Sequence, residues 1–163
     1  GLDGIEKIIK DEGLVRAYED GNDKEARWNM MMASTEGAMA FSKGLGAVHS
    51  MSHAIGANQE LNLHHGTLNA VILPTVLKFN QNHVENKYSR IATAMGINQS
   101  IDLADEIRKL NELIGIPKGL AQMGVTEDMI PKLVKHSITD PSNLTTPRLP
   151  NQEEWEKLFL ESM

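Results

Sequence analysis

The sequence contains no cysteine and few aromatic residues among its 163 positions. The absence of cysteine excludes a disulfide scaffold, a thiolate metal site and a cysteine nucleophile. Aromatic residues make up only 4% of the chain, whereas nine methionines and many alanines and leucines favour helix. Apolar residues recur at helical spacing, and no segment has a convincing strand pattern. We therefore expect an all-α fold that occupies one domain, residues 1–163.

The chain also lacks an excess of basic residues and a long apolar run. Its formal net charge of -6 argues against a nucleic-acid partner, because binding phosphates requires clustered Lys and Arg. The longest apolar run, residues 70–74, is too short to span a membrane. No signal peptide is recognisable, which favours a cytoplasmic protein. The chain starts with glycine and enters a helical pattern at once, which indicates a piece of a longer protein.

Helical periodicity and capping residues give the expected elements. We predict helices over residues 2–16, 24–42, 45–55, 66–80, 85–95, 101–114, 127–138 and 152–162. Asp23 and Thr126 are expected N-caps. Pro74 should kink or divide its helix, and Pro131 conflicts with one unbroken helix from residue 127. Residues 140–150, with three prolines, should be extended, and Met30–Met32 should fill core space.

Four of the six histidines fall within residues 49–65. His49 and His53 are four apart and lie on one face of a helix, and His64 and His65 begin the next element across a short loop. Neutral imidazole is the commonest metal ligand. A metal site usually takes at least three protein ligands, and Glu60 is the only obvious carboxylate nearby. The spacing alone leaves a metal site and an ordinary set of helix histidines both open.

Two motifs carry a family resemblance. Residues 44–57, GLGAVHSMSHAIGA, resemble the pattern G-x-G-x-x-H-x-x-x-H-P-[LI]-G, and residues 65–74, HGTLNAVILP, resemble H-G-x-x-N-A-x-x-L-P. Together they resemble the signature of the iron-containing (group III) alcohol dehydrogenases, and the likeness extends over essentially the whole chain. Ala54 stands where the family has proline. The segment between His53 and His65 is about two residues longer than in typical members.

The resemblance implies the helical C-terminal domain of the dehydroquinate synthase-like, iron-containing alcohol dehydrogenase architecture. In that family one aspartate and three histidines hold iron or zinc, and the aspartate and first histidine lie in an upstream D-x-x-x-H helix. This chain lacks that helix and the nicotinamide-binding N-terminal domain. By resemblance His49 and His65 are metal ligands, and His53 is a catalytic histidine beside the nicotinamide and substrate. His64 is an alternative ligand, but His65 directly precedes Gly66, as the motif requires.

The full-length protein would then transfer a hydride between an alcohol or aldehyde and NAD(P). This chain alone should be inactive and hold little or no Fe²⁺ or Zn²⁺. Its partners would be its own N-terminal domain or a second copy. We expect Ala47, Met51, Ile55 and Leu63 to form an exposed apolar wall. Either the chain self-associates through this wall, or the wall forms an open groove beside a mobile loop, residues 58–64. The alternatives are a non-catalytic helical module, a divergent member with a vestigial metal site, and the glycerol dehydrogenase or dehydroquinate synthase branch.

Overall fold

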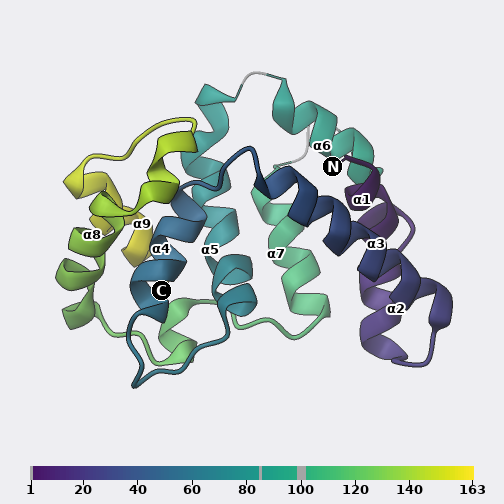
Figure 1. The fold of residues 1–163 in the computed structure, drawn as a ribbon, viewed down its shortest axis with the longest axis horizontal. Coiled ribbons are helices and arrows are strands. Elements are labelled where there is room, and N and C mark those ends of the chain that lie inside the picture. Colours follow the sequence, from purple (N-terminus) through teal and green to yellow (C-terminus); the bar gives the residue numbers. More distant parts are fainter. Residues whose placement is uncertain (1, 85, 99–101) are drawn as a thin grey trace. The chain divides into compact units, whose positions relative to one another are not determined.

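The computed structural model describes residues 2–84, 86–98 and 102–163, and every regular element in these ranges is a helix. The expected all-α class is therefore confirmed. The chain divides into two compact units: unit 1, residues 1–43 and 84–103, and unit 2, residues 44–83 and 104–163. Figure 1 labels the helices of both. None of the helices formed by the described residues is long and apolar enough to cross a membrane.

Unit 1 contains α1 (Leu2–Ile5), a π-helical turn η1 (Glu6–Lys10), α2 (Gly13–Glu19), α3 (Lys24–Phe41) and α6 (Lys87–Met95). The prediction of a single helix over residues 2–16 is wrong, because Glu12, with a left-handed φ of 55°, separates η1 from α2. A Cβ at Gly13 would lie 2.6 Å from the Lys7 backbone oxygen, so this junction requires glycine. Helix α3 begins as predicted, with the Asp23 carboxylate accepting a hydrogen bond from the Ala26 N–H.

Helix α3 is more exposed than its composition suggests. Ala26 is fully buried, but the Met31 residue is 62% exposed, so the expectation that Met30–Met32 all fill the core is wrong for Met31. Five residues of helix place Met31 about 140° around the axis from Ala26, on the opposite side. Trp28, Met39 and Phe41 are exposed as well. Several large apolar side chains of α3 therefore lie on the surface and are not part of the core of unit 1.

Unit 2 is built around two adjacent helices, α4 (Ala47–Gly56) and α5 (His65–Asn80). Helix α8 (Ile130–Thr139) packs on α4, and α9 (Gln152–Glu161) packs on α5 and α8 (Figure 1). Short 3-10 turns and α7 complete it: η2 (Gln81–His83), α7 (Leu103–Leu113), η3 (Leu120–Met123), η4 (Glu127–Met129) and η5 (Pro141–Thr145). The core centres on fully buried side chains from α4, α5 and α9, among them Met51, Ile55, Leu68, Ile72, Trp155 and Phe159.

The prediction that Ala47, Met51, Ile55 and Leu63 form an exposed apolar wall is wrong. Met51 and Ile55 are fully buried, Ala47 is 2% exposed and Leu63 is half-buried. Helices α5 and α8 of the same chain cover the apolar face of α4. Burying a side chain such as Met51 stabilises the fold by roughly 1.5–3 kcal/mol. This burial removes the proposed basis for self-association through the wall.

Pro74, which is predicted to kink or divide its helix, lies inside α5, and α5 is continuous and therefore not divided. Proline has no N–H, so the carbonyl four residues earlier, that of Ala70, loses its helical partner. The Asn111 side-chain amide donates a hydrogen bond to that carbonyl at 2.8 Å. A side chain from α7 thus satisfies the group that Pro74 leaves unpaired.

The chain around α8 also departs from expectation. The Thr126 side chain makes no capping hydrogen bond, so its predicted role as an N-cap is wrong. Residues 127–129 form the separate 3-10 turn η4, and α8 begins only at Ile130. Pro131 falls in the first turn of α8, where its missing N–H costs nothing. Residues expected to be extended form η5, whose N-cap is Asp140: its carboxylate accepts a hydrogen bond from the Ser142 N–H at 2.8 Å.

The N-terminus of α4 depends on this C-terminal segment. The N-cap residue Gly46 has no side chain to cap the helix, and the Thr146 hydroxyl instead accepts a hydrogen bond from the Ala47 N–H at 2.9 Å. Gly44 has φ 105°, and a Cβ there would lie 2.2 Å from the Thr145 hydroxyl oxygen. The start of α4 therefore needs a residue without a side chain at position 44.

We predict that Gly44→Ala lowers the free energy of unfolding by about 2 kcal/mol or more, because alanine is strained at this φ and meets Thr145. Gly56→Ala is the matched control: apart from its chain neighbours and the backbone of its own helix, no atom lies within 4 Å of the added Cβ, and φ is not positive. Urea titration followed by circular dichroism measures both. Equal stability of Gly44→Ala and the original chain would contradict the prediction.

Candidate functional site

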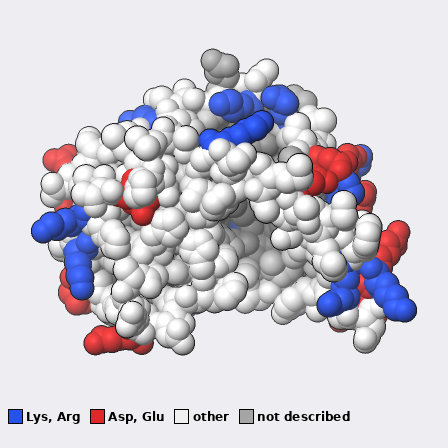
Figure 2. Space-filling model, in the orientation of Figure 1, with Lys and Arg blue, Asp and Glu red and all other residues white. Residues whose placement is uncertain are grey.

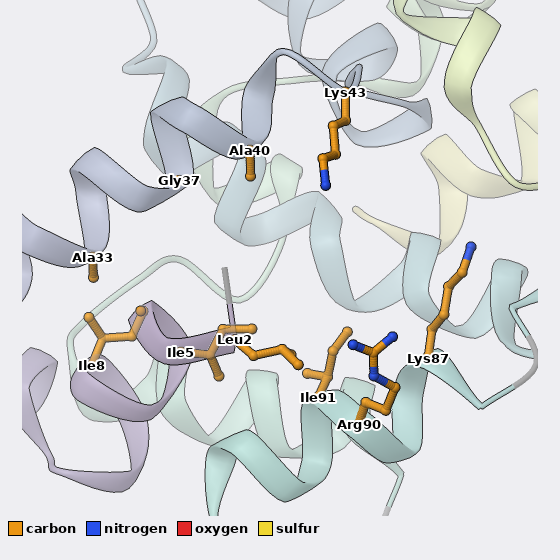
Figure 3. A pocket seen from close by; sticks show the side chains of 11 residues that line it. Leu2, Ile5, Ile8, Ala33, Gly37, Ala40, Lys43, Lys87, Arg90 and Ile91 are labelled. Atoms are coloured by element: carbon orange, nitrogen blue, oxygen red, sulfur yellow. The ribbon is translucent and has the colours of Figure 1, made fainter.

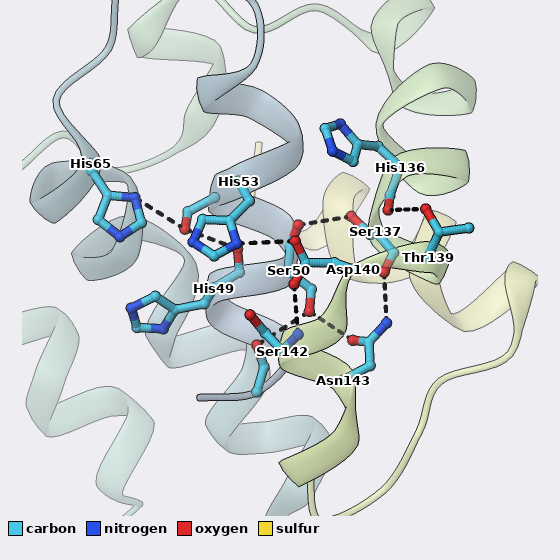
Figure 4. A network of polar contacts seen from close by, with 12 residues as sticks. His49, Ser50, His53, His65, His136, Ser137, Thr139, Asp140, Ser142 and Asn143 are labelled. Atoms are coloured by element: carbon cyan, nitrogen blue, oxygen red, sulfur yellow. Dashed lines mark hydrogen bonds and ion pairs between the residues drawn. The ribbon is translucent and has the colours of Figure 1, made fainter. Parts of the chain in front are cut away.

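Three imidazoles from two helices meet in unit 2. His49 and His53 lie on α4, and His65 is the first residue of α5. The ring centroids are 5.7 Å apart for His49 and His53, 5.3 Å for His49 and His65, and 5.5 Å for His53 and His65. Figure 4 shows the three rings side by side. The structure thus brings together the three histidines that the motifs single out.

His64 has a different place. It is the N-cap of α5, and its Nδ1 accepts a hydrogen bond from the Thr67 N–H at 3.3 Å. The Thr67 hydroxyl lies 3.2 Å from the same nitrogen. The side chain of His64 therefore serves the helix end, whereas His65 joins His49 and His53.

Asn69, one turn after His65, lies between two of the imidazoles. Its Nδ2 is 3.1 Å from His65 Nε2 and 3.4 Å from His49 Nε2. Because an amide nitrogen donates, both Nε2 atoms accept, and their lone pairs converge on the same point. The Asn69 Oδ1 is buried and has no hydrogen-bond partner among the described residues. A buried acceptor without a partner is rare, and this one lies on the side chain whose nitrogen contacts the two imidazole lone pairs.

Asp140 belongs to this site, although none of the sequence motifs indicates it. Its Oδ2 lies 3.0 Å from His53 Nδ1, and its side chain is 7% exposed. Burial raises the pKa of Asp140, but hydrogen bonds from Ser142 and His53 outweigh that effect, so the pKa lies below the ordinary 3.8. An Asp-Pro pair after a helix signals a cap. No local pattern connects it with a histidine 87 residues earlier.

A buried hydrogen-bond network holds α4, α8 and η5 together next to this pair (Figure 4). The Ser50 hydroxyl donates to the Asn143 side-chain oxygen at 2.7 Å, and the Asn143 amide donates to the Ser137 carbonyl at 2.7 Å. The Ser137 hydroxyl donates to the Ser50 carbonyl at 3.2 Å. Ser50 and Ser137 are fully buried. A satisfied buried network rigidifies its surroundings, so the position of Asp140 beside His53 is well defined.

The environment favours neutral imidazoles. Burial is the main cause that lowers the pKa of His49 and of His65 from 6.5. Repulsion by neighbouring imidazoles adds to it, from His65 and His53 on His49 and from His53 and His64 on His65, while Asp140 opposes it at His49. Both rings therefore keep a lone pair at neutral pH, as a metal ligand must.

The described residues include no group of three or more His, Cys, Asp or Glu side chains arranged to hold a metal ion. His49 and His65 nevertheless supply two neutral nitrogens that face one point. Two nitrogens are half of the tetrahedral ligand set of a typical zinc site. The residues present therefore fit a contribution to a shared metal site.

Unit 1 holds a separate groove of about 710 Å³. Its floor is apolar, with Leu2, Ile5, Ile8 and Ile91, and Lys43, Lys87 and Arg90 stand at one end (Figure 3). Lys and Arg side chains gather on this part of the surface in Figure 2. The lining residues include no histidine or carboxylate, so this groove lacks the acid–base groups found in unit 2.

We predict that His49 and His65 titrate below pH 6.5 in the metal-free chain. Both imidazoles bind protons more readily in the unfolded chain than in the folded chain. The free energy of unfolding should therefore fall as the pH drops through 6.5. Histidine-selective NMR titration measures each pKa. In His65→Gln the pKa of His49 should rise, because one repelling imidazole is gone. A pKa above 6.5 for either ring would contradict the prediction that burial and the neighbouring imidazoles lower it.

Comparison with known proteins assigns the chain to a family. The model described as "Fe-containing alcohol dehydrogenase family, C-terminal" matches residues 2–163. The chain is 41% identical to 4-hydroxybutyrate dehydrogenase from Cupriavidus necator over 99% of its length, and 34% identical to 1,3-propanediol dehydrogenase from Klebsiella pneumoniae over 90%. It spans 44% and 40% of these two relatives.

Solved structures agree. The crystal structure of a 1,3-propanediol oxidoreductase matches 99% of this chain with a TM-score of 0.91 and 32% identity, and 44% of that structure is covered. An alcohol dehydrogenase from Oenococcus oeni matches 99% of this chain and 44% of its own, with a TM-score of 0.89 and 25% identity. The chain therefore belongs to the iron-containing alcohol dehydrogenase family and corresponds to the C-terminal part of its members.

Proposed function

We propose that this chain forms part of the metal centre and one wall of the active site in a longer alcohol dehydrogenase. The reaction would be hydride transfer between an alcohol or aldehyde and NAD(P). The observation that carries the proposal is the convergence of His49 Nε2 and His65 Nε2 on one point beside His53. Relatives named as NAD-dependent methanol dehydrogenase and NADPH-dependent butanol dehydrogenase support the cofactor class.

His49 and His65 would hold the metal through their Nε2 atoms. Iron or zinc, when bound, supplies Lewis acidity for the substrate oxygen. The remaining ligands, one aspartate and one histidine, would come from a region upstream of this chain. Asn69 Nδ2 contacts both Nε2 atoms in the metal-free chain, so its amide would have to turn away when the two lone pairs bind the metal.

His53 would exchange a proton with the substrate instead of holding the metal. Its Nδ1 contacts Asp140, and its side chain is 39% exposed, so water or a small molecule can reach the ring. Its ring is nearly parallel to that of His65, with an angle of 16° between the planes. A positioned histidine suits proton transfer near neutral pH. The substrate would be a small alcohol or aldehyde.

Substitutions in the full-length protein test this division of roles. We predict that His49→Ala and His65→Ala lose bound iron or zinc on dialysis, because each removes one ligand. His53→Ala should keep the metal and lower kcat by about 10²-fold or more. Elemental analysis and steady-state kinetics measure the two properties.

His64→Ala is the matched control in the same short segment. It removes the cap of α5, worth about 1 kcal/mol, and should keep the metal. Equal metal loss in all four variants would refute the assignment. A full-length protein that holds no metal and has no dehydrogenase activity before any substitution would instead favour a non-catalytic module or a vestigial site.

We further predict that the 163-residue chain alone has no NAD(P)-dependent dehydrogenase activity and binds Zn²⁺ weakly. A complete structural zinc site is worth about 10–16 kcal/mol, so losing two of four ligands should cost several kcal/mol. Calorimetric titration with Zn²⁺ and an assay for NAD(P)H formation test this. Turnover above background would show that the chain carries a complete site.

A further inference from the structure

The contact between Asp140 and His53 has a consequence for the protons of the imidazole. A carboxylate accepts hydrogen bonds and cannot donate them. Asp140 Oδ2 lies 3.0 Å from His53 Nδ1, so Nδ1 must carry the proton for this contact to be a hydrogen bond. The other ring nitrogen, Nε2, then has a lone pair. In Figure 4 it lies on the side of the ring that faces His65.

We propose that Asp140 is a positioning residue that holds His53 in the tautomer protonated at Nδ1, so that Nε2 can accept a proton beside His49 and His65. The tautomer follows from the contact alone, whereas its use in catalysis rests on the proposed function. In alcohol oxidation the substrate hydroxyl proton would pass to Nε2, and NAD(P)⁺, when bound, would supply the acceptor for the hydride from the carbon. The products would be the carbonyl compound, NAD(P)H and an imidazolium ion, which would return its proton to water.

The surroundings of Asp140 suit this role. The Oδ1 atom accepts from the Ser142 N–H, while Oδ2 faces the imidazole, so the two oxygens have separate contacts. The cap of η5 needs only one acceptor, which asparagine or serine also provides. The neighbouring network of Ser50, Ser137 and Asn143 fixes η5 against α4, which limits the freedom of the carboxylate to turn away.

A carboxylate next to an imidazole also stabilises the imidazolium formed when Nε2 takes a proton. Asp140 is almost fully buried, so its charge acts on His53 with little screening by water. The geometry therefore provides both parts of the role: the correct tautomer before proton transfer and a compensating charge after it.

The tautomer can be measured on the 163-residue chain itself. Long-range ¹H–¹⁵N NMR at a pH where His53 is neutral distinguishes a protonated from an unprotonated ring nitrogen. We expect Nδ1 protonated and Nε2 unprotonated in the original chain. A ring protonated at Nε2 overturns the proposal before any variant is made.

Asp140→Asn tests the cause. Asparagine can keep the cap through its side-chain oxygen and then offers its NH₂ group to His53 Nδ1, so the tautomer should reverse. Asp23→Asn is the matched control: it makes the same change at the cap of α3, where the carboxylate contacts Arg16 and Ala26 instead of a histidine. It should leave the His53 signals unchanged. An unchanged tautomer in folded Asp140→Asn overturns the proposal.

Should Asp140→Asn fail to fold, Asp140→Ser keeps a capping oxygen and removes the second one. The His53 ring should then populate both tautomers, and a ring still protonated only at Nδ1 overturns the proposal. In the full-length enzyme Asp140→Asn should lower kcat by about 10²-fold with KM and metal content unchanged. A reversed tautomer with normal kcat refutes proton transfer by His53, which belongs to the proposed function, and leaves the tautomer assignment intact.

Discussion

The burial of one face of α4 is the constraint on which the candidate site depends. Met51 and Ile55 are fully buried under α5 and α8, so the helix cannot rotate without exposing them. That orientation turns His49 and His53 toward the start of α5, where His65 lies. The hydrogen bond from the Ala47 N–H to Thr146 fixes the beginning of the same helix. Packing of apolar side chains thus positions the polar groups that would perform the chemistry.

Four histidines close together in sequence have different environments in the structure. His64 caps α5, His53 is paired with a buried carboxylate, and His49 and His65 share the amide of Asn69. Burial and repulsion by neighbouring imidazoles lower the pKa of His49 and His65, which suits metal binding. All four residues are histidines, so the hydrogen-bond partner of each ring decides whether it can cap a helix, transfer a proton or bind a metal.

The chain belongs to a family whose compared members are more than twice its length. Its convergent nitrogen pair is compatible with this relation, because two imidazoles meet at one point and the described residues provide no third ligand arranged with them. The unit 2 core, in contrast, contains fully buried side chains from α4, α5 and α9. Unit 2 therefore has a core of its own, whereas the proposed metal site would take its remaining ligands from the longer protein.

The sequence by itself determined the helical class, most helix positions, the family, and the grouping of His49, His53 and His65, because periodicity, caps and motifs are local signals. Only the tertiary structure decided how long-range contacts modify them. Asn111 satisfies the carbonyl that Pro74 leaves unpaired, so α5 continues through the proline. Asp140 meets His53 across 87 residues because α8 packs on α4. Sequence spacing cannot show such contacts, since packing brings their partners together only in the folded chain.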